Sequence, residues 1–227
     1  MNSIIRSSLN SKVNLKNFSR RTYLTASANK LSQPFKKHQN DNVINYTFYD
    51  SQTSTWQYIL HCNLSKRGVI IDPVLNYDLN SGVISSESAD GLLEFIENNK
   101  LKIDYVLETH AHADHISSAR YLKSHLNVPV GIGKRIKDTQ KTFAKIYNIP
   151  YESLENSFDK YFDDDEIFRL GDHLNGKVIH LPGHTNDHIG YQFGKYIFTG
   201  DSIFLAPTYS ARTDFPNGKA EDLYEVS

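Results

Sequence analysis

One run of seven residues constrains the fold more than any other part of this 227-residue chain. Residues 109–115 read Thr-His-Ala-His-Ala-Asp-His, so three histidines and an aspartate lie within six residues. The residues before it, 103–107, are typical of a buried strand, and residues 116–126 follow a helical pattern. The cluster is therefore expected at the carboxyl end of a strand, where α/β folds place their ligands.

Imidazole and carboxylate groups held together in a tight turn are donors that metal ions use in proteins. Histidines also pair at surface turns without a metal, but four candidate ligands at adjacent and alternate positions favour a metal site. Two later turns add His184, in Leu-Pro-Gly-His-Thr, and Asp201, in Thr-Gly-Asp-Ser. Each follows a predicted strand, and each alone fits ordinary turn chemistry. The neighbouring His180 and His188 are interpreted as structural or surface residues.

Charge divides the chain into a basic segment and an acidic remainder. Residues 1–40 contain eight of the 25 Lys and Arg and no Asp or Glu, which leaves 17 basic residues against 26 acidic ones. A basic, Ser-rich, weakly amphipathic segment is typical of a mitochondrial transit peptide, the alternative being a disordered basic tail. The acidic remainder does not favour nucleic-acid binding. No apolar run approaches the ~18 residues that a membrane span needs.

Residues 43–227 are predicted to form one α/β domain with two sheets and outer helices, because strands precede and follow the helices. Strands are expected over residues 42–49, 55–62, 68–72, 103–107, 129–132, 167–170, 177–181, 188–193 and 196–199. Helices are expected over residues 89–99, with Ser88 as N-cap, 116–126 and 135–148. Residues 74–86 are expected to be a loop, and the acidic run 163–166 a solvated turn. The single cysteine, Cys62, excludes an intramolecular disulfide and is expected to be buried.

The ordered set of Thr-His-Ala-His-Ala-Asp-His, Pro-Gly-His-Thr and Thr-Gly-Asp resembles the metallo-β-lactamase superfamily over most of residues 43–227. The resemblance implies an αββα sandwich, with two mixed β-sheets flanked by helices and the metal site at one edge of both sheets. It also implies that the C-terminal strand and helix portion is missing, because the family usually continues with a further strand that bears a histidine.

Two further segments carry a narrower resemblance. Residues 211–218, Ala-Arg-Thr-Asp-Phe-Pro-Asn-Gly, and residues 71–74, Ile-Asp-Pro-Val, are similar to the persulfide dioxygenases, also called sulfur dioxygenases. The sequences of these segments are most similar to the β-lactamase-hydrolase-like branch of that group. Tyr-Ser-Ala stands where the animal-type form has Gly-Cys-Gly, which leaves the preferred persulfide carrier open.

This resemblance implies a non-haem iron enzyme that oxidises glutathione persulfide, or a related small persulfide, with O2 to sulfite and thiol. It implies one Fe(II) per chain in a facial triad of two histidines and one carboxylate, namely His110, His184 and Asp201. Three further residues would surround the metal, orient ligands and handle protons: His112, Asp114 and His115. Together with the basic segment, it places the enzyme in sulfide catabolism in the mitochondrial matrix.

The substrate pocket is expected to include Arg212, Thr213 and Tyr191. Arg212 would pair with substrate carboxylates or with the sulfur oxyanion, and a salt bridge with Asp214 is the alternative. A homodimer is left open.

Two other functions stay open. The first is a dinuclear zinc thioester hydrolase of the glyoxalase II type, in which His112, Asp114 and His115 become metal ligands and Asp201 bridges two zinc ions. No histidine follows His188, so the second zinc site would lack one ligand. The second is a truncated pseudo-enzyme that binds a metal or a partner without turnover.

Overall fold

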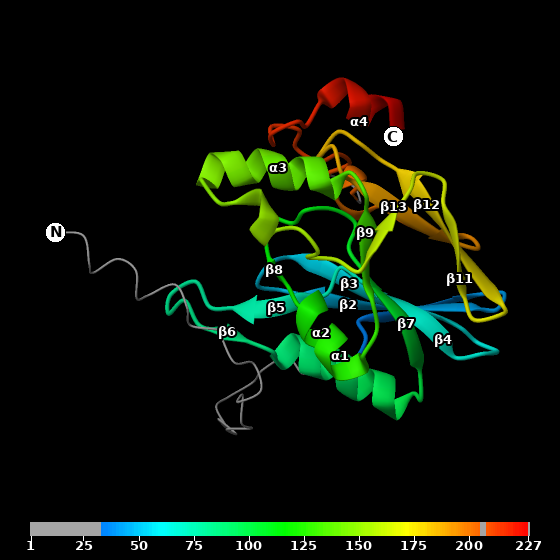
Figure 1. The fold of residues 1–227 in the computed structure, drawn as a ribbon. Helices are drawn as coiled ribbons and strands as arrows, with labels where there is room; N and C mark the ends of the chain where they lie inside the picture. Colours follow the sequence, from blue (N-terminus) through cyan, green and yellow to red (C-terminus); the bar gives the residue numbers. More distant parts are fainter. Residues whose placement is uncertain (1–32, 205–207, 227) are drawn as a thin grey trace.

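The computed structural model describes residues 33–204 and 208–226, and two main sheets form its centre (Figure 1). The larger sheet has the strand order β1-β2-β3-β4-β7-β9-β10. Strands β1, β2, β3 and β4 pair with one another in antiparallel fashion. On its other side β4 pairs in parallel with β7, and β7, β9 and β10 are also paired in parallel, so this sheet is mixed. The bounds are β1 (Lys36–Asn40), β2 (Val43–Asp50), β3 (Thr55–Cys62), β4 (Arg67–Ile71), β7 (Lys102–Leu107), β9 (Val130–Gly133) and β10 (Lys160–Phe162).

The second main sheet is antiparallel throughout, where mixed pairing was expected in both sheets. Its strands are β11 (Ile167–Leu170), β12 (Leu174–His180), β13 (Ile189–Phe193) and β14 (Tyr196–Phe198). A small third sheet is formed by β5 (Val74–Tyr77), β6 (Ile84–Ser85) and β8 (Ile116–Ser117). The helices are α1 (Glu87–Asn98), α2 (Ala119–Leu126), α3 (Ile136–Tyr147) and α4 (Ala220–Val226), with short 3-10 turns η2 (Tyr151–Ser153) and η3 (Gly200–Ser202).

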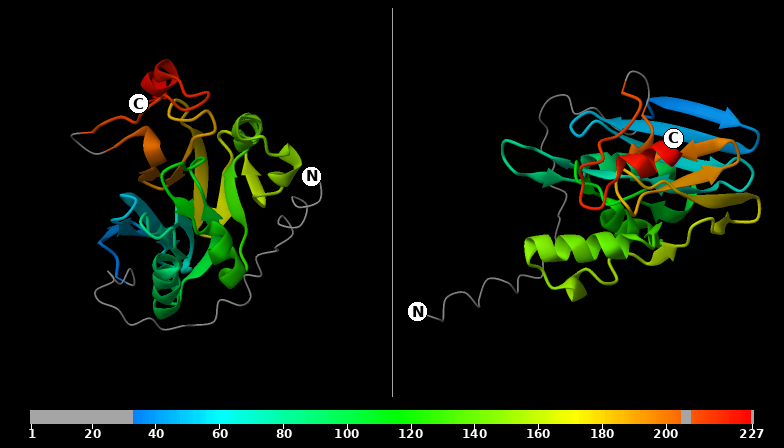
Figure 2. Two further views of the ribbon diagram at one scale, coloured as in Figure 1. Left: turned by 90° about the vertical axis from the view of Figure 1, so that its left-hand side faces the viewer. Right: turned by 90° about the horizontal axis from the view of Figure 1, so that it is seen from above.

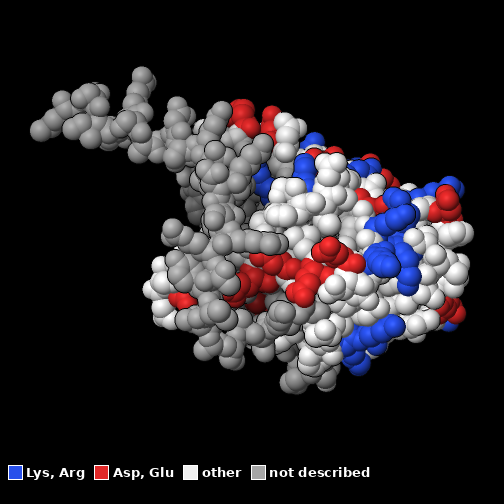
Figure 3. Space-filling view, turned by 90° about the horizontal axis from the view of Figure 1, so that it is seen from below, with Lys and Arg blue, Asp and Glu red and all other residues white. Residues whose placement is uncertain are grey.

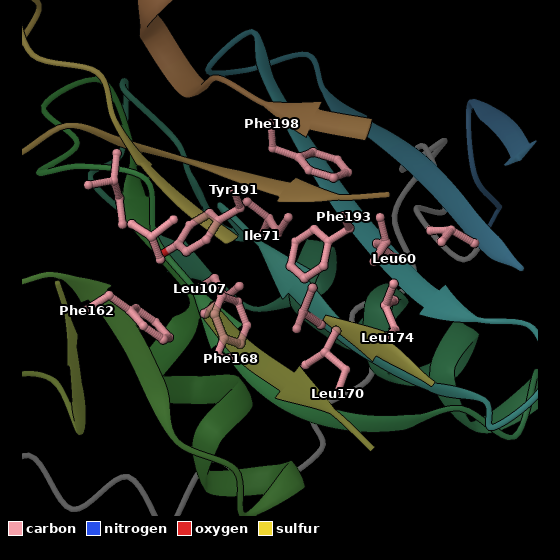
Figure 4. Packing of buried hydrophobic residues seen from close by; sticks show 14 of the residues in the cluster. Leu60, Ile71, Leu107, Phe162, Phe168, Leu170, Leu174, Tyr191, Phe193 and Phe198 are labelled. Atoms are coloured by element: carbon pink, nitrogen blue, oxygen red, sulfur yellow. The ribbon is translucent and has the colours of Figure 1, made fainter. Parts of the chain in front are cut away.

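The main core lies between the two large sheets (Figure 4). Alternation along β13 turns Ile189, Tyr191 and Phe193 toward the larger sheet, where they meet Leu60, Ile71 and Leu107, among others. Each fully buried aliphatic or aromatic side chain contributes about 1.5–3 kcal/mol relative to exposure. This layer holds the two sheets face to face, so the edge at which their loops meet is fixed.

A second apolar layer lies on the other face of the larger sheet. Helices α1 and α2 cover this face (Figures 1 and 2) and bury Leu92, Phe95 and Leu122 against Ile59 and Ile70 of the sheet, among others. Helix α3 reaches the loop between β12 and β13, where the Thr139 hydroxyl donates to Asp187 at 2.7 Å. The chain therefore has the predicted sandwich of two sheets flanked by helices.

Five strands differ from the sequence-based expectation. Strands β5 and β6 lie in the expected loop 74–86, and β8 occupies the first two residues of the expected helix 116–126. Strand β10 follows α3 and was not expected, and β1 lies within the segment that we assigned to the basic tail. These strands are short or lie at sheet edges, and the exposed residues of β1 show no apolar alternation. Pairing with a neighbouring strand, rather than sequence pattern, decides such segments.

One local expectation is corrected, and two others are confirmed. Helix α1 begins at Glu87, and Ser88 is buried inside its first turn, where its hydroxyl accepts a hydrogen bond from Gln57 at 3.1 Å. The acidic run at residues 163–166 is an exposed or half-buried turn, as expected, and each of its carboxylates pairs with a basic side chain. Cys62 is a buried free thiol, as expected.

The predicted transit peptide falls almost wholly on residues 1–32, which lie outside the described residues. Acidic side chains gather on the face seen from below, the side on which α1 and α2 lie (Figure 3). Within the described ranges, every helix is too short or too polar to cross a bilayer.

Candidate metal centre

His110 is held in the loop that directly follows β7. The backbone NH and the hydroxyl of Thr109 donate to the buried carboxylate of Asp72 at 2.8 and 2.9 Å. Because the Thr109 hydroxyl uses its proton on Asp72, its oxygen accepts from His110 Nδ1 at 2.9 Å. This chain of bonds orients the imidazole with Nε2 as the atom available for a metal.

His184 is oriented by the loop that carries the Ala-Arg-Thr-Asp-Phe run. Its Nδ1 donates to the backbone carbonyl of Arg212 at 2.8 Å, and its ring packs edge-on against Phe215 with the ring centres 4.9 Å apart. Gly183 precedes it with φ +134°, and a Cβ there would come within 2.4–2.5 Å of Leu223 in α4. His184 Nε2 is therefore the nitrogen that is free to coordinate.

Asp201 completes the predicted set from the η3 turn after β14. Its Oδ2 lies 3.8 Å from Nε2 of His110 and 3.6 Å from Nε2 of His184. The three candidate donor atoms lie within 4.8 Å of one another. The structure thus brings together three residues that are separated by up to 91 positions in the sequence.

The donor set fits a metal ion on an observation independent of its geometry. His110 Nε2 is buried and has no hydrogen-bond partner in the described part of the chain. Leaving such a group unsatisfied costs about 1–3 kcal/mol, which coordination to a cation would remove. Burial, together with the neighbouring histidines, also holds the pKa of His110 well below its usual value, so the ring is neutral and able to coordinate.

A second donor set lies beside the first and is formed by His112, Asp114 and His115. His115 Nδ1 lies 3.1 Å from Asp114 Oδ2, and its Nε2 is a second buried nitrogen without a partner among the described residues. Burial alone would raise the pKa of Asp114, but the hydrogen bond and charge of His115 lower it to about 2. The predicted surrounding residues are therefore adjacent to the triad and include a carboxylate held ionised.

His112 is bound by two carboxylates that the sequence analysis did not assign to the site. Its Nε2 lies 3.1 Å from Asp72 and 3.0 Å from Glu108, and both acids are buried. Burial would lower the pKa of His112, but these two carboxylates raise it well above its usual value. Because Nε2 is used, Nδ1 is the nitrogen that remains for a metal or a proton. In the sequence, the Ile-Asp-Pro-Val run could have pointed to Asp72 as a site residue. For Glu108 the sequence offered only its position directly before Thr109.

His188 and Asp187 support the site from behind. His188 is buried and structural, one of the two readings given from sequence: its Nε2 accepts the NH of Asp201 at 3.0 Å, and its ring stacks on His110 at 4.6 Å. Burial lowers the pKa of His188 to about 3. Asp187 accepts the NH of Ala111 at 2.9 Å and the hydroxyl of Thr139, so it ties the histidine-rich loop to α3.

The three predicted substrate-binding residues occupy different environments. Arg212 is exposed and makes the alternative salt bridge with Asp214, at 2.6 and 3.0 Å, while its guanidinium lies 4.7 Å from the Phe215 ring centre. Thr213 is half-buried in the same loop. Tyr191, expected at the pocket wall, lies instead in the core, because alternation along β13 turns it inward, and its hydroxyl donates to the Glu108 carbonyl at 2.9 Å.

A cleft of about 990 Å³ opens beside the two donor sets. Asp72, His112, Asp114, His115 and Asp201 lie along one end of it. The cleft continues between the β1–β3 side of the larger sheet and strand β14. A small molecule can therefore approach the candidate ligands from solvent.

Comparison with known proteins decides the family. The model of the metallo-beta-lactamase superfamily matches residues 53–226. The chain belongs to the metallo-β-lactamase superfamily. The αββα sandwich and the histidine-rich loop agree with this membership. The chain is therefore a member of an enzyme superfamily and carries His and Asp residues placed to bind a metal.

Curated relatives come from more than one branch of the metallo-β-lactamase superfamily. The chain is 39% identical to a beta-lactamase hydrolase-like protein of Xylella fastidiosa, over 78% of this chain and 41% of that protein. It is 41% identical to glyoxylase B2 of Dictyostelium discoideum, over 78% of this chain and 62% of that protein. It is 33% identical to the hydroxyacylglutathione hydrolase GloC of Haemophilus influenzae, over 70% of each. The chain thus spans less than two thirds of the first two relatives.

Among solved structures, ETHE1 from Myxococcus xanthus is 27% identical, with a TM-score of 0.62 over 80% of this chain and 67% of that chain. The superfamily and the fold are therefore shown, and the β-lactamase hydrolase-like relatives match the predicted branch.

Proposed function

We propose that this chain is an iron(II)-dependent persulfide dioxygenase. The observation that carries the proposal is the triad of His110, His184 and Asp201. Its donor atoms lie within 4.8 Å of one another, and one of them, His110 Nε2, is buried without a hydrogen-bond partner among the described residues. Two histidines and one carboxylate leave coordination positions open for two substrates. The likeness to ETHE1 from Myxococcus xanthus supports the same branch.

Iron(II) bound there would supply one-electron chemistry with dioxygen, which zinc lacks. The proposed substrate is glutathione persulfide or a related small persulfide. One O2 and one water convert it to the free thiol and sulfite, and the sulfur–sulfur bond is broken. The four electrons that reduce O2 come from the terminal sulfur.

The protein's own groups would position the reactants and move protons. The Arg212 carbonyl and Thr109 hydroxyl fix the rings of His184 and His110, so the donor geometry is set before substrate binds. His112, held by Asp72 and Glu108, and the Asp114–His115 pair line the same cleft within reach of a bound substrate. These groups can hold the water and carry the protons that the hydrolytic step releases.

The test is a metal and activity assay on protein purified without added metal. About one iron per chain, with O2 uptake on glutathione persulfide and release of sulfite, is the expected result. Two zinc ions per chain and hydrolysis of S-lactoylglutathione, without O2 uptake, would overturn the proposal.

A second function, a dinuclear zinc thioester hydrolase, has its own supporting observation. The donor set of His112, Asp114 and His115 lies next to the triad, and His115 Nε2 is buried and unpaired among the described residues. The likeness to hydroxyacylglutathione hydrolase GloC favours the same chemistry. In this reading Asp201 would bridge two zinc ions, and the same assay separates the two functions. Metal binding with neither activity would favour the pseudo-enzyme.

We further propose the mitochondrial matrix as the compartment, on the acid-free, basic composition of residues 1–40. Because β1 begins at Lys36, the mitochondrial targeting signal would lie before that residue. Residues 1–35 fused to a fluorescent protein should enter mitochondria. A diffuse cytosolic signal would contradict the proposal.

A further inference from the structure

The end of the cleft away from the metal centre has a different chemistry from the end beside it. Lys36 and His38 of β1 and Tyr196 of β14 line it, whereas Trp56 and Tyr58 of β3 line the cleft between it and the metal end. The carboxylates that line the cleft, Asp72, Asp114 and Asp201, all belong to the metal end. The cleft is therefore acidic and metal-binding at one end, aromatic in the middle and basic at the other.

Strand register places these basic and aromatic side chains on one face. Lys36 pairs with Thr47, which pairs with Tyr58, and His38 pairs with Asn45. Directly paired residues point to the same side of a sheet. Lys37 points to the opposite side, where its ammonium lies 5.6 Å from the ring centre of Tyr46. Successive lysines of one strand thus face the cleft and the outer face, respectively.

The same register gives the span of the cleft. Thr55 contacts the metal end, since its hydroxyl lies 3.4 Å from both Asp114 Oδ2 and His115 Nδ1. Three residues along β3 and two strand spacings across the sheet separate Thr55 from Lys36, about 14 Å between backbones. A carrier of two or three residues extends over about 10 Å, and the Lys36 side chain covers the remainder.

The Lys36 ammonium is available for an anionic ligand. It makes no ion pair with any residue in the described ranges, 33–204 and 208–226. Asp41, which follows the opposite end of β1 from Lys36, pairs with Lys195 at 3.8 Å. A carboxylate reaching this end of the cleft would therefore meet an uncompensated positive charge and the imidazole of His38.

We propose that Lys36, assisted by His38, recognises a carboxylate of the thiol carrier while the carrier's sulfur lies at the metal centre. This inference rests on the proposed function for the identity of the sulfur group. It deepens that function by assigning the carrier to small, acidic thiols and by locating the determinant on β1. Carriers without a carboxylate would bind without this contact.

Binding can be measured without turnover, because Trp56 is the single tryptophan of the chain and lines the cleft. The full chain is titrated with S-methylglutathione, which has carboxylates but no reactive persulfide, and Trp56 fluorescence is followed. Lys36→Gln should raise the Kd about 5-fold, which is the size expected for one partly exposed charged contact. Lys37→Gln is the matched control and should bind like the wild type. The diethyl ester of S-methylglutathione should bind equally weakly to all three proteins.

Steady-state assays add a second measurement. With glutathione persulfide, Lys36→Gln should raise KM about 5-fold and leave kcat within twofold, because the contact is far from the reacting sulfur. An unchanged Kd in Lys36→Gln, an equal loss in Lys37→Gln, or no response of Trp56 at saturating ligand would each overturn the inference. Lys36-dependent binding without persulfide turnover would instead sustain this site and refute the proposed reaction.

Discussion

The two unpaired imidazole nitrogens have different surroundings. His110 Nε2 faces His184 and Asp201, whereas His115 Nε2 belongs to the neighbouring set with His112 and Asp114. Both are buried without a hydrogen-bond partner among the described residues, and both would gain from a cation or a bound water. Substitution at each position separates a ligand of the proposed iron from a residue beside it.

His184→Ala should abolish iron binding, because it removes one of three protein ligands. Metal content of the purified protein, measured by mass spectrometry, tests this expectation. His180→Ala is the matched control: that ring lies on β12, contacts the Asn186 carbonyl at 3.2 Å and belongs to neither donor set. Iron retained at wild-type stoichiometry in His184→Ala would contradict the triad.

His115→Ala should lower turnover while most of the iron stays bound. The ring orients Asp114 through a 3.1 Å contact and is outside the triad, so its loss should affect ligand positioning and proton transfer. A loss of roughly 10- to 100-fold in kcat is expected for a residue that supports a metal site. Stoichiometric loss of metal from His115→Ala would favour the dinuclear assignment.

At the level of the elements, the metal centre depends on short turns whose backbone conformation is demanding. Gly200 opens the η3 turn with φ +48°, and a Cβ there would lie 2.5 Å from the Thr109 hydroxyl and 2.8 Å from His188 Nε2. Asp201 follows directly, and its NH bonds to His188. The glycine thus permits the turn to approach the histidine-rich loop closely enough for Asp201 to join the triad.

Gly200→Ala should therefore destabilise the fold and weaken metal binding together. The left-handed conformation alone costs about 1–2 kcal/mol for a residue with a Cβ. Gly194→Ala is a suitable control, since φ is +58° there but the nearest atom to a Cβ is 3.6 Å away. Thermal unfolding should show a loss in both variants, and metal analysis a loss only in Gly200→Ala. Equal behaviour of the two in both assays would exclude the close-approach role.

At the level of the whole molecule, buried neutral histidines link stability to pH. Burial lowers the pKa of His61 below its usual 6.5, although the Cys62 carbonyl acts in the opposite direction. The unfolded chain therefore binds the proton more readily than the folded one below pH 6.5. The stability that the neutral ring contributes is fully present above pH 6.5 and is lost as the pH falls toward the folded pKa.

His61→Phe should flatten this pH dependence, since phenylalanine keeps an aromatic ring against Tyr46 but cannot bind a proton. Urea unfolding of the metal-free protein at about pH 7.5 and about pH 5.5 gives the comparison. The free energy of unfolding should fall more between these values in the wild type than in the variant. Parallel profiles would mean that the His61 pKa is the same in both states.

Much of the fold was predictable because local pattern and tertiary structure agree. The runs around Val43–Asp50, Thr55–Cys62 and Lys102–Leu107 combine β-branched and aromatic residues with burial, and each forms a strand close to its expected bounds. The strands that were missed, such as β1 and β5, have weak apolar patterns and exist through pairing with neighbours. A segment whose sequence is typical of a loop can thus form a strand when the edge of a neighbouring strand is free to pair with it.

By itself, the sequence determined the chemistry of the site: the donor types, their order along the chain and the turns that carry them. It could not determine which nitrogen of each histidine faces the metal, because Thr109, Asp72 and the Arg212 carbonyl decide this across the fold. It also left Glu108 unassigned and placed Tyr191 at the pocket. Tertiary structure decided these points, since burial and hydrogen-bond partners depend on which strands pack together, and spacing along the chain carries no such information.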